Sequence, residues 1–167
     1  KNKIIKESEF KKIEMEIKKS IEKDVEWSLS QEDPNPNNAH RYVYSPKSIE
    51  VETAKNPISQ EKIVMVDAIN HALNEEMDLN PKMIIYGQDI ADPKGGVFTA
   101  TKGLSSKYGK DRVFNSPLAE SSIIGTAIGL AVTGYKPVVE IQFADYIWTS
   151  MMQIRNEVAT MRYRSGG

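Results

Sequence analysis

The sequence is poor in the residues that build redox, metal and highly charged binding sites. Its 167 residues contain no cysteine and two histidines, which excludes disulfides, thiolate nucleophiles and cysteine-ligated metals and makes a structural zinc site unexpected. Basic and acidic residues nearly balance, at 22 and 23, so there is no basic surplus to bind nucleic acid or an anionic membrane. No apolar run approaches the roughly 18 residues of a membrane span. We therefore expect neither nucleic acid nor a membrane as a partner.

Both ends of the sequence look interrupted. The chain begins at Lys1 without a methionine, continues with charged residues instead of an apolar signal core, and stops at Gly167 directly after an expected helix. We expect both ends to be cuts within a longer polypeptide. The expected location is the bacterial cytoplasm, with the mitochondrial matrix as the alternative.

Composition divides the chain into three parts. In residues 1–30, apolar residues recur every three or four positions among Lys and Glu, which predicts an amphipathic helix from Phe10 to near Ser30. Residues 31–61 are typical of a linker, because Asn and Ser surround four helix-breaking prolines: Pro34, Pro36, Pro46 and Pro57. Residues 62–167 carry the apolar pattern of a folded domain.

Within residues 62–167, short apolar runs alternate with helical periodicity. Strands are expected at residues 83–86, 113–114 and 138–143, and helices at residues 66–77, 101–108, 119–132 and 146–163. This alternation predicts an α/β fold in which helices flank a parallel sheet. Ligands of such sheets bind beyond the carboxyl ends of the strands, so the loops that follow the three strands are the candidate sites.

A single carboxylate, Glu120, stands where such a site is expected. It follows the second predicted strand and opens a helix whose small residues allow close packing: Gly125, Ala127, Gly129 and Ala131. Acidic residues are also common in a first helical turn because they complement the helix dipole and the free amides there. Local features alone therefore favour a structural role for Glu120.

A family resemblance assigns Glu120 a different role. Three consecutive blocks, at residues 117–120, 125–134 and 137–146, resemble the beta subunit of the thiamine-diphosphate-dependent 2-oxo acid dehydrogenase decarboxylase component. Further similar blocks lie at residues 66–70, 86–89, 95–98 and 161–167. Residues 26–27, 34–36 and 42–44 resemble the end of the family's alpha subunit. The resemblance implies a fused alpha–beta polypeptide: an alpha-like tail helix (1–30), a linker (31–61) and a pyrimidine-binding domain (62–167).

The resemblance implies that Glu120 is catalytic. A glutamate at this position contacts the ring nitrogen of the aminopyrimidine of thiamine diphosphate and controls the proton that activates the thiazolium carbon. Leu118, Gln142 and Tyr146 are implied to surround the same ring, although each alone is also explained as a core, strand-end or helix-start residue. A partly apolar pocket made by Leu118 and Tyr146 is expected to raise the pKa of Glu120.

One position departs from the family pattern. The family often has Gly-Glu-Asp at residues 87–89, and this sequence has the neutral Gln88 in place of the glutamate. An amide cannot pass a proton as a carboxylate does, so the acidic path that joins paired sites in the family is expected to be missing or to use other groups. His40 and His71 are expected to be structural or solvated.

The resemblance implies an enzyme that decarboxylates a 2-oxo acid and transfers the acyl group to a lipoyl-bearing acyltransferase. The family's Gly-Asp-Gly element, which binds Mg and the diphosphate, is absent from this sequence, so no metal ligand is expected within it. An alpha-type domain should complete the site, in a homo-oligomer of fused chains or an alpha2beta2-like assembly. The implied substrate is either pyruvate or a branched-chain 2-oxo acid, and residues 143–146 resemble branched-chain members of the family more. A transketolase-like thiamine enzyme and a non-catalytic assembly module are the alternatives.

Overall fold

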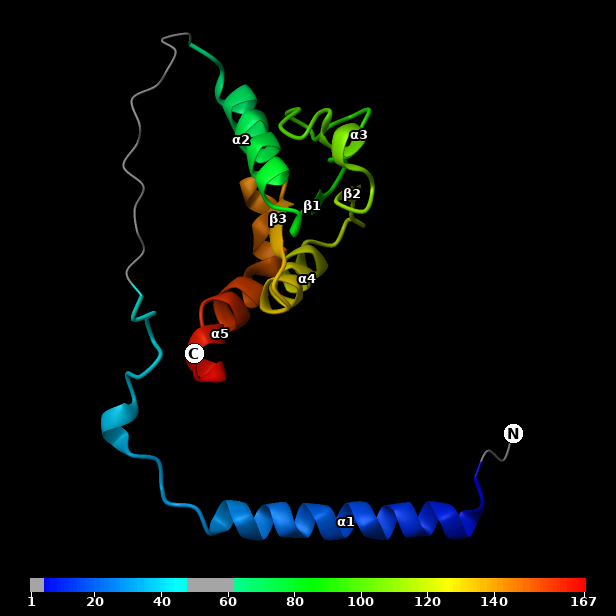
Figure 1. Cartoon of the computed structure of the whole chain (residues 1–167), viewed down its shortest axis with the longest axis vertical. Coiled ribbons are helices and arrows are strands. Elements are labelled where there is room, and N and C mark those ends of the chain that lie inside the picture. Colours follow the sequence, from blue (N-terminus) through cyan, green and yellow to red (C-terminus); the bar gives the residue numbers. More distant parts are fainter. Residues whose placement is uncertain (1–4, 48–61) are drawn as a thin grey trace. The chain divides into compact units, whose positions relative to one another are not determined.

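The computed structural model in Figure 1 describes residues 5–47 and 62–167. The chain divides into two compact units, Lys1–Arg41 and Tyr42–Gly167, and each is described by itself. Residues 48–61 of the expected linker lie outside the described residues. The boundaries expected at residues 30 and 61 therefore stay predictions.

The first unit consists mainly of one helix, α1 (Glu7–Leu29), as the apolar periodicity predicts. The helix start is closed by Glu9, whose carboxylate accepts a hydrogen bond from the Lys6 amide at 2.9 Å. No residue of α1 is buried, and apolar side chains such as Phe10 and Ile17 are about half exposed. A short 3₁₀ turn, Pro36–Asn38, follows the helix. Within the described residues of this unit, the apolar stripe of α1 is therefore uncovered.

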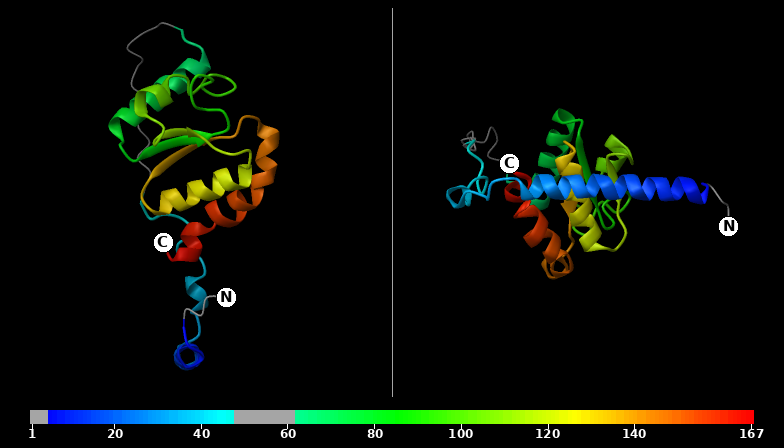
Figure 2. Two further views of the ribbon diagram at one scale, coloured as in Figure 1. Left: turned by 90° about the vertical axis from the view of Figure 1, so that its right-hand side faces the viewer. Right: turned by 90° about the horizontal axis from the view of Figure 1, so that it is seen from below.

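The described residues of the second unit form a parallel three-stranded sheet between helices. Its elements follow in the order α2 (Met65–Leu79), β1 (Met83–Gly87), α3 (Leu104–Tyr108), β2 (Val113–Asn115), α4 (Glu120–Val132) and β3 (Lys136–Glu140). The strands lie in the order β2-β1-β3. In the left view of Figure 2, α2 and α3 lie on one side of the sheet, and α4 lies on the other with the C-terminal helical segments. The predicted α/β fold is confirmed.

The hydrophobic core lies between β1, β2 and the helices α2 and α3. Strand residues alternate between the two faces of a sheet, so Met83 and Ile85 of β1 point to the same side. The core cluster consists of Met77, Met83, Ile85, Ile90, Leu104 and Val113. The packing is tight at the other edge of β1 as well. A Cβ atom added to Gly87 would lie 2.7 Å from the carbonyl oxygen of Glu140 in β3.

An aromatic pair links β1 to β2 and to α4. Tyr86 stands opposite Phe114 in the parallel register, and their rings are stacked with centroids 5.3 Å apart and planes 2° apart. The Tyr86 hydroxyl donates a hydrogen bond of 2.8 Å to the carbonyl of Ile123 in α4. The first turn of α4 is thereby fixed against the centre of the sheet.

Two predicted elements differ from the structure. The strand expected at residues 138–143 is β3, which begins two residues earlier and ends three residues earlier. Pro137 is tolerated there because β3 is an edge strand among the described residues, and its outer side needs no amide donor. The single helix expected at residues 146–163 is instead a 3₁₀ segment (Ala144–Ser150), a π-helical segment (Gln153–Val158) and a short helix, α5 (Met161–Ser165). Apolar spacing predicts a helix but does not distinguish the tighter and wider turns.

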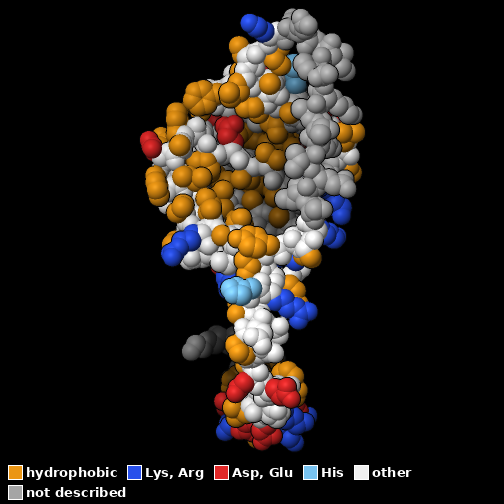
Figure 3. Space-filling view, turned by 90° about the vertical axis from the view of Figure 1, so that its left-hand side faces the viewer, with side chains coloured by type: hydrophobic (Ala, Val, Ile, Leu, Met, Phe, Trp, Pro, Cys, Tyr) orange, Lys and Arg blue, Asp and Glu red, His pale blue; other side chains and the backbone are white. Residues whose placement is uncertain are grey.

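Hydrophobic side chains gather over much of the face of the second unit that Figure 3 presents. Across the described residues of this unit, several large hydrophobic side chains are more than half exposed, including Leu118, Val132 and Val158. Exposed apolar surface of this extent is typical of a face that meets another polypeptide.

Among residues 5–47 and 62–167, none of the helices has both the length and the apolar character that a membrane crossing requires.

Candidate active site

The candidate site lies at the carboxyl ends of the three parallel strands. Gln88 directly follows β1, and Glu120 opens α4 after the short loop that follows β2. Gln142 and the 3₁₀ segment that carries Tyr146 and Thr149 follow β3. Because the strands are parallel, their carboxyl ends meet at one edge of the sheet, which brings residues far apart in the sequence together.

The carboxylate of Glu120 is held by two neutral donors. The side-chain amide of Gln88 donates to Oε1 at 2.8 Å, and the Thr149 hydroxyl lies 3.2 Å from Oε2. Gln88 is 2% exposed, so its amide is enclosed by the fold, whereas Glu120 is only partly buried. Each oxygen of Glu120 therefore has its own partner from a different segment of the chain.

The two donors are themselves anchored. The side-chain amide of Gln142 donates to the backbone carbonyl of Gln88 at 2.9 Å, which ties the loop after β3 to the loop after β1. The Thr149 hydroxyl also lies 3.0 Å from the backbone carbonyl of Tyr146. The Ser121 hydroxyl, next to Glu120 in α4, donates to the backbone carbonyl of Thr149. A continuous set of contacts thus joins the loop after β1, the start of α4 and the 3₁₀ segment.

The expectation of a raised pKa for Glu120 is wrong for this chain. The hydrogen bond from Gln88 lowers the pKa of Glu120, with smaller contributions from a backbone hydrogen bond and from Thr149, and these outweigh the opposing effect of desolvation. The apolar pocket assumed for that prediction is open, because Leu118 is 82% exposed and Tyr146 is 45% exposed. Because hydrogen-bond donors contact Glu120 and no apolar side chains of the described residues enclose it, the ionised form of Glu120 is favoured.

Three of the four predicted site residues are connected by hydrogen bonds within the described part of the chain, and Leu118 is not. Glu120 and Gln142 are joined through Gln88, and the backbone of Tyr146 is joined to Glu120 through Thr149. Leu118 lies in the loop two residues before Glu120, with its side chain directed mainly to solvent. We retain Leu118 as a proposed ring contact that would be completed by a ligand or a partner chain.

An aromatic cluster supports Tyr146. The ring of Phe143 lies edge-on to the Tyr146 ring, with centroids 5.3 Å apart, and Phe98 lies edge-on to Phe143 at 5.7 Å. Edge-to-face pairs at these separations are favourable arrangements for aromatic rings. The side chain of Tyr146 is therefore oriented by its neighbours while part of it stays open to solvent.

Sequence reasoning missed two residues of this site. Gln88 was recognised as a departure from a family pattern and not as a partner of Glu120, although its place directly after a buried strand was a usable signal. Thr149 carried no such signal, because it lies within a segment expected to be a regular helix. Its contact depends on the 3₁₀ conformation of residues 144–150.

A second carboxyl group near this edge of the sheet, that of Glu140, has its pKa shifted in the opposite direction. Glu140 ends β3, and burial raises its pKa. Its Oε1 is buried and has no hydrogen-bond partner among the residues that the structure describes, and a Cβ atom on Gly96 would lie 3.3 Å from both carboxyl oxygens. Gly96 therefore leaves the room that the carboxyl group of Glu140 occupies.

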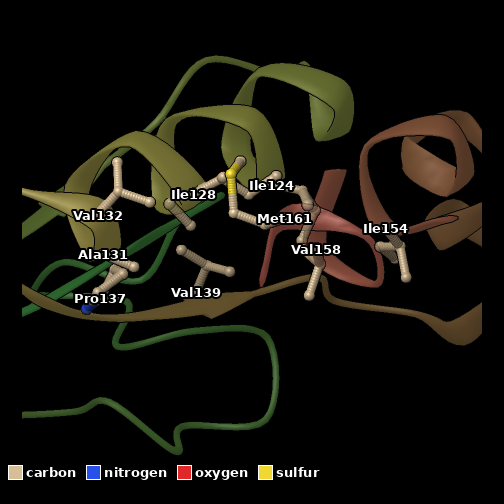
Figure 4. Close-up of a pocket in the computed structure, with 10 residues that line it drawn as sticks. Ile124, Ile128, Ala131, Val132, Pro137, Val139, Ile154, Val158 and Met161 are labelled. Atoms are coloured by element: carbon tan, nitrogen blue, oxygen red, sulfur yellow. The ribbon is translucent and has the colours of Figure 1, made fainter. Parts of the chain in front are cut away.

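A wide apolar groove lies away from these residues. It has a volume of about 420 Å³ and is lined by α4, β3 and the C-terminal helical segments. Figure 4 shows Ile128 of α4 and Val139 of β3 on facing sides of it, with Met161 between the elements. None of the four predicted site residues lines this groove, so it is distinct from the candidate site.

Among residues 5–47 and 62–167, no three His, Cys, Asp or Glu side chains are grouped so that they could hold a metal ion.

Comparison with known proteins places these observations in a family context. Residues 61–166 match the model of the transketolase pyrimidine-binding domain family. The chain is 48% identical over 120 residues to the mitochondrial 2-oxoisovalerate dehydrogenase subunit beta of Dictyostelium discoideum, an alignment that covers 72% of this chain and 31% of that protein. It is 45% identical over 106 residues to the pyruvate dehydrogenase E1 component subunit beta of Staphylococcus epidermidis, covering 64% of this chain and 32% of that protein. The chain thus spans about a third of the length of these relatives.

Proposed function

Because the chain belongs to the transketolase pyrimidine-binding domain family, a thiamine-diphosphate-dependent family, we propose that it forms the beta-type pyrimidine half-site of a 2-oxo acid dehydrogenase. The enzyme would oxidatively decarboxylate a 2-oxo acid and transfer the acyl group to a lipoyl-bearing acyltransferase. The observation that carries this proposal is the placement of Glu120. Its carboxylate is held at the carboxyl edge of a parallel sheet by donors from two other loops.

The residues of the site fit an aminopyrimidine ring. A flat ring needs exposed apolar or aromatic surface, and a ring nitrogen that shares a proton needs a carboxyl oxygen within reach. Leu118 and Tyr146 offer exposed surface of these kinds. Oε2 of Glu120 faces a rotatable hydroxyl, which can turn aside for a ligand. The chemistry of the donors thus supports the cofactor assignment.

When bound, thiamine diphosphate supplies the nucleophilic carbon and the electron sink for decarboxylation. We assign to Glu120 the role of holding or releasing a proton at Oε2, opposite the ring nitrogen. Leu118 and Tyr146 would orient the ring, and Gln142 would keep Gln88, and through it Glu120, in place.

The proposal also assigns partners. An alpha-type domain would complete the active site and bind the diphosphate through Mg, because the family's metal-binding element is absent from this sequence. The assembly would be an oligomer of fused chains or alpha2beta2-like, with a lipoyl-bearing acyltransferase as the acceptor. The large exposed apolar surface supports an extensive interface. Of the two relatives described above, one is bacterial and one mitochondrial, and we propose the bacterial cytoplasm, with the mitochondrial matrix as the alternative.

The substrate is proposed as a branched-chain 2-oxo acid or pyruvate. The relatives include a 2-oxoisovalerate dehydrogenase subunit and a pyruvate dehydrogenase subunit at similar identity. Residues 143–146 resemble the branched-chain members of the family, which favours a branched acyl group weakly. Competition between 2-oxoisovalerate and pyruvate for the purified enzyme would decide between the two.

The test is reductive acylation of a lipoyl domain by the full-length enzyme and its Glu120→Gln variant. General acid–base groups contribute about 100- to 10,000-fold to rate, so we expect a loss of that order with the fold preserved. The matched control is Glu75→Gln, which makes the same change at an exposed position in α2 and should leave turnover unaffected.

The same assay separates the alternatives. A transketolase-like enzyme, favoured only by the breadth of the family, would transfer a ketol group between sugars and acylate no lipoyl domain. An assembly module would keep full turnover when Glu120 is replaced by Gln. Either result would overturn the proposed function.

A further inference from the structure

The two donors to Glu120 differ in how freely they can move. The Gln88 amide is almost fully enclosed, and its backbone carbonyl is tied to the Gln142 side chain at 2.9 Å. The Thr149 residue is exposed, and its hydroxyl can rotate about a single bond. One oxygen of Glu120 therefore has a fixed partner and the other has a movable one.

The orientation of the Gln88 amide follows from the chemistry of its partner. An ionised carboxylate only accepts hydrogen bonds, so the nitrogen of the amide must face Oε1 at 2.8 Å. This arrangement stabilises the charged form of Glu120, in agreement with the lowered pKa of this residue. Gln88 thus fixes both the place and the charge of the carboxylate.

Thr149 has one hydroxyl hydrogen and two acceptors. Oε2 of Glu120 lies 3.2 Å from the hydroxyl oxygen and the Tyr146 carbonyl lies 3.0 Å from it. A single hydrogen can serve only one acceptor well at a time. When a ligand approaches Oε2, the hydroxyl can turn to the Tyr146 carbonyl and keep a hydrogen bond. Releasing Oε2 therefore leaves the Thr149 hydroxyl hydrogen-bonded to the Tyr146 carbonyl.

We propose that Gln88 and Thr149 are positioning residues of this site. Gln88 stays hydrogen-bonded to Oε1 of Glu120, and Thr149 is hydrogen-bonded to Oε2 until the ring nitrogen of the cofactor takes its place. This inference rests on the proposed function, because it presupposes that Glu120 meets the cofactor. It adds which of the two oxygens does so, and which neutral groups determine its protonation before the cofactor binds.

The experiment measures proton uptake when thiamine diphosphate and Mg bind to the full-length enzyme. Calorimetric titrations in buffers of different ionisation enthalpy give the number of protons taken up at each pH. If Glu120 is ionised before binding and shares a proton afterwards, uptake follows its titration in the free enzyme. The Glu120→Gln variant should lose this component, which assigns it.

Four variants test the two donors. Gln88→Met removes the fixed donor and should shift the uptake profile to higher pH, and Gln88→Glu should shift it in the same direction through like-charge repulsion. Thr149→Val should give a smaller shift in that direction, and Thr149→Ser should restore the original profile. For Gln88→Met we also expect kcat to fall by about 10- to 100-fold with little change in KM, because the carboxylate loses its fixed position.

The matched control is Gln153→Met, which makes the same change at a partly buried glutamine whose Cγ atom lies beside Gly125 and whose amide is not one of the donors to Glu120. It should leave the uptake profile unchanged. An unaltered profile in Gln88→Glu and Thr149→Val would overturn the inference, and these two conserve shape if Gln88→Met fails to fold. The proposed function fails separately, if Glu120→Gln keeps both turnover and proton uptake.

Discussion

Replacing Gly87 by alanine tests the packing that positions the site. A Cβ atom at Gly87 would lie 2.7 Å from the backbone oxygen of Glu140, well inside the 3.4 Å at which ordinary contact begins. The obstacle is backbone in a paired strand, so β1 and β3 must separate. Overpacking of this kind costs about 1–3 kcal/mol. At 1.4 kcal/mol per factor of ten, the protected amides of β1 and β3 should exchange with deuterium about 5- to 140-fold faster.

The assay is hydrogen–deuterium exchange of the full-length protein, read on peptides that cover β1 and β3. The matched control is Gly129→Ala in α4, where the same Cβ atom meets nothing within 4 Å. A glycine-to-alanine change inside a helix stabilises it by about 1 kcal/mol, so exchange in α4 should slow or stay unchanged. Equal exchange in Gly87→Ala and the unmodified protein would refute the reasoning about this contact.

Two further predictions concern pH. The carboxylate of Asp92 accepts hydrogen bonds from the Gly103 amide and from Ser105 and Ser106, which lower its pKa from 3.8 to about 2. Its stabilising effect is present above pH 3.8 and is lost as the pH falls through about 2, so Asp92→Asn should cost roughly 1 kcal/mol at neutral pH, after allowance for solvent screening, and almost nothing in strong acid. Urea unfolding of both proteins at several pH values measures this difference, and a constant difference would contradict it. Burial raises the pKa of Glu140 above its ordinary value of 4.5. The protonated side chain therefore stabilises the fold below pH 4.5, and this stabilisation is lost as the pH rises through the pKa of Glu140 in the folded protein. Glu140→Gln should therefore unfold at higher urea concentration than the unmodified protein at neutral pH, with no gain below pH 4.5.

Much of the second unit could be predicted from apolar spacing. The helix expected at residues 66–77 is α2, and Asn80, which caps it, was placed correctly because Pro81 cannot continue a helix. The strand expected at 83–86 is β1, with the buried character that predicted it. These elements depend on local burial and local chain breaks, which the sequence carries directly.

The site was less predictable because its contacts are not local. The bond from Gln88 to Glu120 spans 32 residues, and the one from Thr149 to Glu120 spans 29. The position of Thr149 depends on a tightened helical turn, which has the same apolar spacing as a regular helix. The error in the pKa of Glu120 has a related origin: the resemblance named Leu118 and Tyr146 as neighbours, but a sequence does not show how far such side chains are covered, and in the structure both are exposed.

The stacked pair of Tyr86 and Phe114 has a consequence for the fidelity of folding. A slip of β2 by one residue would turn its side chains to the opposite face, put Asn115 opposite Tyr86 and lose the stack. The loop after β2 would then deliver Glu120 to the wrong side of its partners. Tyr86 and Phe114 thus disfavour a misfolded, inactive strand register without contacting a ligand. Substitutions at either residue would lower the yield of active protein before they altered its chemistry.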